Sequence, residues 1–154
     1  MSEQGPHQRP MPRSGARRAT RGERIVGALL ALGCLSVLVI AAWLHADTNG
    51  HGTHTQLGLS ECAWAEYFEA PCATCGMTTS FAYAADGRWL SSLLAQPFGA
   101  LLTVLTSIVF WGGLHISATG SRLGAAVGPA ISTRALVIGT VLFLAAWAFK
   151  WAVW

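Results

Sequence analysis

Long apolar stretches dominate the pattern of this chain. Residues 25–46 and 96–116 contain no formally charged residue, and residues 135–154 contain only Lys150, near the chain end, where a long side chain can reach the membrane interface. Because a helix rises about 1.5 Å per residue, each stretch can cross a hydrocarbon core of about 30 Å. The pattern predicts an all-α integral membrane protein with about three transmembrane helices over these ranges.

The composition agrees with this class of protein. Hydrophobic residues make up 53% of the 154 residues and charged residues only 11%, whereas a soluble domain carries about 25% charged residues. So little polar surface argues against a soluble fold, and we expect one membrane domain over residues 25–154, with the lipid bilayer as a partner. Trp147, Trp151 and Trp154 would share one helix face, which predicts an anchoring belt at the outer interface.

The basic residues are concentrated before the first apolar stretch. Residues 1–24 contain six arginines and are otherwise rich in Pro, Gly and Ser, which predicts a disordered cytoplasmic tail. Residues 47–95 contain one basic residue, Arg88, so the positive-inside rule predicts a cytoplasmic N-terminus, an extracytoplasmic loop over 47–95 and an extracytoplasmic C-terminus. The tail arginines are scattered and lack interleaved aromatic residues, so no nucleic-acid partner is expected.

Turn and helix signals divide this loop into parts. Residues 47–60 are glycine-rich and polar, which predicts a flexible linker. Residues 61–70 predict a short helix ended by Pro71. Thr78 or Thr79 is expected to cap a second short helix that reaches Ala85 and lies in the membrane interface.

Three of the four cysteines lie in the same loop, at positions 62, 72 and 75. Cys72 and Cys75 form a Cys-x-x-Cys pair before the predicted interfacial helix, whose dipole would lower a thiol pKa and favour thiol–disulfide exchange. The sequence lacks the βαβ pattern that surrounds this motif in thioredoxin-like proteins. Cys34 lies in the first apolar stretch and is interpreted as a small buried residue.

Two other kinds of site fit the same cysteines. Three thiolates with an imidazole from His51 or His54 would make a tetrahedral zinc site, and thiolates also suit copper as Cu(I). A structural disulfide such as Cys62–Cys72 would instead staple the loop and stabilise it by about 2–3 kcal/mol. The sequence leaves these three classes open, but if the chain folds back at Pro71 all three sulfurs should converge.

The residues around the cysteines form a specific pattern. Cys62 is followed by nine residues and then by Cys72-Ala73-Thr74-Cys75-Gly76-Met77-Thr78, with Asp86-Gly87 at a turn and Pro97 at the start of the next apolar stretch. Over about residues 60–115 this resembles the signature of a family of small bacterial membrane proteins, the domain of unknown function 2752. The departures from that signature are Ala73 for proline, Thr79 for arginine and Gln96 for asparagine. The resemblance implies a bacterial inner-membrane protein and no particular activity.

The sequence contains no evident Ser-His-Asp set, phosphate-binding glycine loop or paired catalytic carboxylates. The leading hypothesis is a non-enzymatic inner-membrane protein whose cluster of Cys62, Cys72 and Cys75 forms a structural disulfide or a metal site. Such a protein would be an accessory or interaction protein with a membrane-protein partner. The alternative is a membrane thiol–disulfide exchange protein with Cys72 and Cys75 as its catalytic residues.

Overall fold

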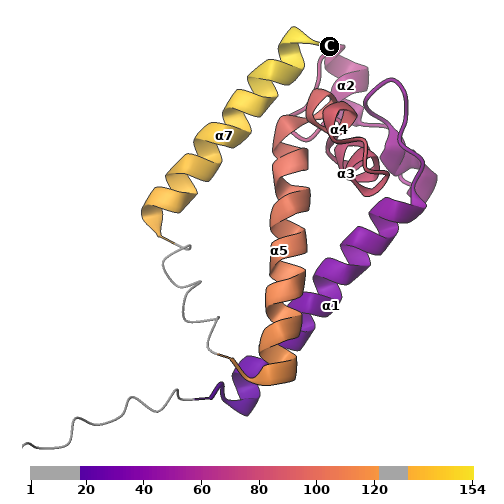
Figure 1. Ribbon diagram of the computed structural model, residues 1–154. Helices are drawn as coiled ribbons and strands as arrows, with labels where there is room; N and C mark the ends of the chain where they lie inside the picture. The colour runs from indigo at the N-terminus through magenta and orange to yellow at the C-terminus, as the bar shows by residue number, and fades with distance from the viewer. Residues whose placement is uncertain (1–17, 122–131) are drawn as a thin grey trace, which may run out of the picture.

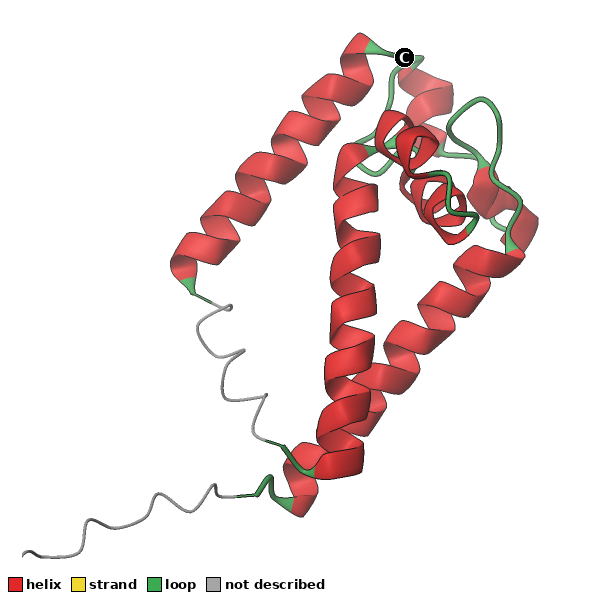
Figure 2. Ribbon diagram, viewed as in Figure 1, coloured by secondary structure: helices red, strands yellow, loops and turns green. Residues whose placement is uncertain are grey.

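The computed structural model describes residues 18–121 and 132–154, and all regular elements within these ranges are helices (Figures 1 and 2). In chain order they are α1 (Arg21–Trp43), η1 (Thr53–Leu57), α2 (Ala63–Phe68), α3 (Met77–Ala85), α4 (Trp89–Ala95), α5 (Pro97–Thr119) and α7 (Thr133–Ala152). Three of them, α1, α5 and α7, are long and apolar enough to cross a membrane. The prediction of an all-α protein with three spanning helices is confirmed.

The first spanning helix begins at Arg21 rather than at residue 25, because a capping box closes its N-terminus. The Thr20 hydroxyl accepts a hydrogen bond from the Glu23 N–H at 3.2 Å, and the Glu23 carboxylate accepts one from the Thr20 N–H at 2.6 Å. Residues 21–24 of the predicted tail are therefore helical, and residues 1–17 lie outside the described residues. The other spans differ from the predicted ranges by one to three residues at their ends.

α1 and α5 pack closely and cross through small residues (Figure 1). A Cβ atom added at Gly113 would lie 2.6 Å from the Gly27 carbonyl oxygen, and one added at Gly27 would lie 3.0 Å from the Gly113 oxygen. Glycine at both positions lets the two backbones approach, as small residues do between membrane helices. At the ends of the same two helices, the Arg24 side chain donates to the carbonyls of Ser117 and Ala118.

The loop between α1 and α5 folds into four short helices that gather at one end of the molecule (Figure 1). The expected flexible linker contains η1 instead, because the buried Thr53 hydroxyl accepts from the Asp47 N–H and pairs with the Thr79 hydroxyl at 2.8 Å. α3 begins at Met77 behind Gly76, so neither Thr78 nor Thr79 caps it as predicted. α4 was not predicted as a separate helix.

α4 stops before α5 because Pro97 forces the preceding residue out of the helical region. Gln96 has extended dihedral angles, φ −165° and ψ 108°, and its side-chain oxygen accepts from the N–H groups of Phe98 and Gly99. Ser80 joins the three helices, since its buried hydroxyl bonds the Ser92 hydroxyl and the Gln96 carbonyl. This polar junction fixes α3 and α4 on the first turn of α5.

α7 stands apart from the other spanning helices along most of its length (Figure 1). Most of its large apolar side chains, such as Leu136 and Ile138, are exposed, and a lipid bilayer would cover the surface that they form. Its C-terminal part reaches the folded loop (Figure 1), where the Trp154 ring stacks on His51. Here the Trp147 ring N–H donates to the Pro71 carbonyl at 3.1 Å.

Candidate functional site

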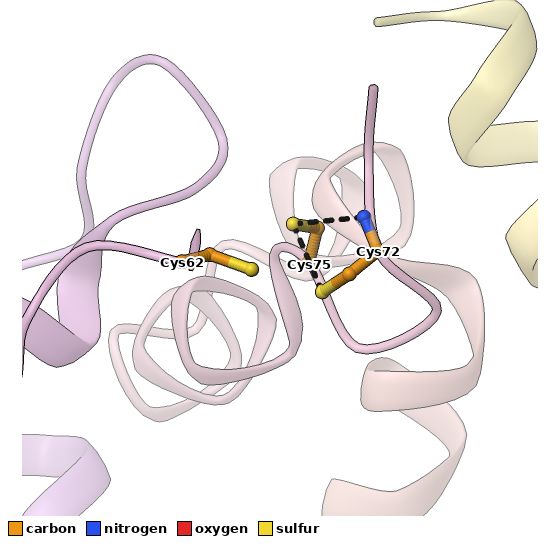
Figure 3. A group of neighbouring side chains, drawn as sticks. All are labelled: Cys62, Cys72 and Cys75. Atoms are coloured by element: carbon orange, nitrogen blue, oxygen red, sulfur yellow. Dashed lines mark hydrogen bonds between the residues drawn. The ribbon is translucent and has the colours of Figure 1, made fainter. Parts of the chain in front are cut away.

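The three loop cysteines form a compact cluster of sulfur atoms. The Sγ atoms of Cys62, Cys72 and Cys75 all lie within 4.8 Å of one another, and those of Cys72 and Cys75 are 3.2 Å apart. Figure 3 shows the three side chains pointing toward one another, with Cys62 on one side and the Cys-x-x-Cys turn on the other. The predicted convergence of the sulfurs is confirmed.

Local chain conformation brings these residues together. Cys62 is the extended residue before α2, and α2 ends at Phe68 because Glu69 has a left-handed backbone conformation, with φ 49°. The helix therefore ends before Pro71, which was the predicted stop. After Pro71 the chain makes a tight turn in which the Cys75 N–H donates to the Cys72 carbonyl at 3.1 Å.

Gly76 makes the turn after the cysteine pair sterically feasible. Its φ is +84°, a conformation that side chains with a Cβ rarely adopt. A Cβ atom at this position would also lie 2.6 Å from the Gly50 carbonyl oxygen and 2.7 Å from that of Ala95. The turn is thus enclosed by backbone from the segment before η1 and from the end of α4, and only glycine fits there.

The two thiols of the pair have opposite pKa shifts. Burial raises the pKa of the Cys75 thiol to about 12, and its hydrogen bond with Cys72 acts in the same direction. Burial also acts to raise the pKa of Cys72, but hydrogen bonds from Thr74, Cys75 and Cys62 outweigh it and lower that pKa below its ordinary value. Cys72 is therefore the thiol that deprotonates first, and its Sγ lies 3.2 Å from that of Cys75.

The shift at Cys72 has a different cause from the predicted one. The sequence places the pair directly before a helix whose dipole would lower a thiol pKa, and α3 does begin after both cysteines, with Gly76 as its cap. The Thr74 hydroxyl lies 3.4 Å from the Cys72 sulfur and is the largest of the lowering contributions. The threonine inside the Cys-x-x-Cys motif was a signal for this contact that sequence reasoning did not use.

The cluster lines an open cavity of about 690 Å³. His51 and His54 line the same cavity, but neither belongs to the group of ligand atoms within 4.8 Å of one another. The His51 ring stacks on Trp154 at 4.6 Å between centroids, and a His54 ring nitrogen lies 3.2 Å from the Ser60 carbonyl. The structure thus brings the three cysteines together and holds the two candidate histidines in other contacts.

Sequence reasoning missed one charged residue at this site. The Lys150 side chain is 4% exposed, and its Nζ donates to the Gly50 carbonyl at 3.2 Å, on the loop segment that encloses Gly76. The sequence predicted that this side chain would reach the membrane interface. The available signal was its place as the chain's single lysine and as the only charged residue in the apolar stretch 135–154.

Residues at the departures from the family signature have structural roles. Thr79 is buried and pairs with Thr53, and Gln96 caps α5 while its amide nitrogen lies 3.4 Å from the Ala73 carbonyl. Arg88 stacks over the Tyr83 ring at 4.6 Å. Cys34, the remaining cysteine, is a partly exposed residue of α1.

Residues 62–111 match the model of a protein family described as protein of unknown function (DUF2752). The match confirms the resemblance that the cysteine pattern indicated, and it runs from the first cysteine of the cluster into α5. No curated protein and no solved structure matches the chain.

Proposed function

We propose that this DUF2752 protein binds one soft metal ion, zinc or copper as Cu(I), through Cys62, Cys72 and Cys75. The observation that carries the proposal is the convergence of three sulfur atoms within 4.8 Å. Thiolate sulfur is the preferred ligand of both ions in proteins. The proposed role is that of a metal-binding membrane protein, and the predicted membrane-protein partner stays a prediction.

The sulfur spacing is close to what a metal ion requires. With a metal–sulfur distance of about 2.3 Å, sulfurs around one ion lie about 3.8 Å apart in tetrahedral geometry and about 4.0 Å apart in trigonal geometry. The 3.2 Å separation between Cys72 and Cys75 would widen slightly, and the separations from Cys62 are no longer than 4.8 Å.

The two candidate ions differ in their need for a fourth ligand. Zinc in a structural site takes four ligands, so it would add His51, His54 or a water molecule from the cavity. Cu(I) is a softer ion, and we expect three thiolates to hold it without an imidazole. Binding of zinc with loss of affinity in His51→Ala or His54→Ala would identify the fourth ligand.

The experiment is metal analysis of full-length protein purified in mild detergent without reductant, after loading with Zn²⁺ or Cu⁺ and removal of excess ion. We expect about one ion per chain in the wild type and in Cys34→Ser, which removes a cysteine outside the cluster. Cys62→Ser, Cys72→Ser and Cys75→Ser should each lose it. Equal metal content in all five proteins would contradict the proposal.

Thiol–disulfide exchange is a second candidate function, favoured by the opposite pKa shifts of the pair. The Cys72 thiolate would attack a partner disulfide, forming a mixed disulfide and releasing one partner thiolate, which takes up a proton. Cys75 would then lose its proton and attack the Cys72 sulfur, releasing the second partner thiol. The partner disulfide gains two electrons, and the Cys72–Cys75 dithiol is oxidised to a disulfide.

Trapping distinguishes the two candidates. If exchange is the function, Cys75→Ser should accumulate mixed disulfides through Cys72, visible as mass additions that reductant removes. If the cysteines form a structural disulfide, the denatured wild type should contain two fewer free thiols than its four cysteines, and Cys75→Ser should trap no partner. If the cysteines only bind metal, all four thiols should react with a thiol reagent once the metal has been chelated and the protein denatured.

We also propose that the protein is an inner-membrane protein of a bacterium, with the N-terminus in the cytoplasm and the cysteine cluster outside it. Arginine asymmetry supports this orientation, since the segment before α1 is rich in arginine and residues 47–95 contain only one. Fusions of a periplasm-active reporter at Gly58 and Trp154 should be active, and a fusion at Gly124 should be silent. The reverse pattern would place the cluster in the cytoplasm.

A further inference from the structure

Lys150 is a buried cation beside the cysteine cluster. Its side chain is 4% exposed, and its Nζ donates to the Gly50 carbonyl at 3.2 Å. Within the described part of the chain, no ion pair joins Lys150 to a carboxylate, and its Nζ lies 5.8 Å from the centroid of the Trp154 ring. A buried ammonium group without an anion is unfavourable, because burial removes its hydration.

The fold brings this cation to the turn that contains the cysteine pair. Nζ of Lys150 lies 3.3 Å from the point that a Cβ atom on Gly76 would occupy, and Gly76 directly follows Cys75. The end of α7 is held there by two further contacts: the Trp147 ring N–H on the Pro71 carbonyl and the Trp154 ring on His51. Three contacts from one helix end thus bring Lys150 to the turn that contains the cysteine pair.

We propose that Lys150 is a binding residue of the metal site, where its fixed positive charge compensates the negative charge of the metal–thiolate complex. The inference rests on the proposed metal-binding function and adds a residue from α7 to the three cysteines of the loop. It explains why the buried ammonium has no carboxylate partner, since the bound complex would be its anion.

The net charge of the site changes when either ion binds. Starting from three neutral thiols, binding of Zn²⁺ with release of three protons changes the charge of the site by −1. Binding of Cu⁺ with release of three protons changes it by −2. A neighbouring positive charge therefore stabilises both complexes, and it stabilises the Cu⁺ complex more.

The test compares Lys150→Met, Lys150→Arg and Arg88→Met by competition titration with chelators of known affinity for Zn²⁺ and for Cu⁺. Arg88→Met is the matched control, because it removes another cation, one that lies in the cysteine-containing loop and stacks over the Tyr83 ring. Lys150→Met should weaken Cu⁺ binding at least tenfold, equivalent to about 1.4 kcal/mol. It should weaken Zn²⁺ binding by a smaller factor, and Lys150→Arg and Arg88→Met should stay close to the wild type.

Unchanged affinities in Lys150→Met, or a loss equal to that in Arg88→Met, would overturn the role of Lys150 while leaving the three-cysteine site in place. A wild type that binds neither ion would overturn the proposed function and this inference with it. If Lys150→Met does not fold, amine labelling of the wild type tests the same inference, because Lys150 is the only lysine of the sequence. Its peptide should be labelled more slowly with metal bound than without, and equal labelling would contradict the inference.

Discussion

Substitution of Gly76 by alanine should disrupt the turn that holds the cysteine pair. The left-handed conformation at φ +84° disfavours any residue with a Cβ by about 1–2 kcal/mol. The added Cβ would also lie 2.6 Å and 2.7 Å from two backbone carbonyl oxygens, and overpacking of this kind adds about 1–3 kcal/mol. We therefore expect Gly76→Ala to lower the free energy of unfolding by about 2–5 kcal/mol.

Gly87→Ala is the matched control for this substitution. Gly87 has φ +75°, but no atom lies within 4 Å of the position of an added Cβ. Gly87→Ala should therefore lower the free energy of unfolding only by the cost of the left-handed conformation, about 1–2 kcal/mol. The difference between the two variants measures the collision with the Gly50 and Ala95 carbonyls.

Unfolding in detergent by increasing sodium dodecyl sulfate, followed by tryptophan fluorescence, would measure both free energies. The same samples should show faster alkylation of Cys75 in Gly76→Ala, because the turn that buries this thiol is displaced. If Gly76→Ala is no less stable than Gly87→Ala, the enclosure of the turn by the two carbonyls is refuted.

Three further predictions follow from the loop. In metal-free protein at mildly alkaline pH, iodoacetamide should modify Cys72 before Cys75, because the pKa of Cys72 is lowered and that of Cys75 is raised to about 12. Peptide mass spectrometry would measure the two modification rates, and equal rates would contradict this asymmetry. The raised pKa of Cys75 stabilises the fold below the ordinary thiol pKa, so the unfolding free energy should fall as pH rises from about 9 to about 12, and Cys75→Ser should abolish this dependence. Ser80→Ala should lower the unfolding free energy by about 1–3 kcal/mol, because the buried Ser92 hydroxyl and Gln96 carbonyl each lose a hydrogen-bond partner. Ser36→Ala is the control: this serine lies on the exposed surface of α1, and its replacement should change the unfolding free energy little in the same denaturation assay.

The sequence was sufficient to predict the spanning helices and the convergence of the thiols. Length and lack of charge identify α1, α5 and α7, since both properties are local. Convergence of the sulfurs could be expected from Pro71 and Gly76, because these residues restrict or permit specific turns within a short segment. The shifted start of α1 is also local, and the Thr20–Glu23 capping box was a readable signal that was overlooked.

The contacts that complete the site could not be predicted, because they join segments far apart in the chain. Lys150 lies 100 residues after its partner Gly50, and Trp147 lies 76 residues after Pro71. No periodicity within α7 shows which loop residue its C-terminal end meets. The buried pair of Thr53 and Thr79 likewise depends on how η1 packs on α3, so a polar segment that reads as a linker becomes ordered.

X-ray absorption spectroscopy at the edge of the bound metal tests the central claim most directly. For wild-type protein loaded with Zn²⁺ or Cu⁺, we predict three sulfur neighbours, at about 2.3 Å for Zn²⁺. Cys62→Ser should reduce the sulfur count, and Cys34→Ser should leave it unchanged. A first shell made only of nitrogen and oxygen, or the same sulfur count in Cys62→Ser, would contradict a three-cysteine metal site.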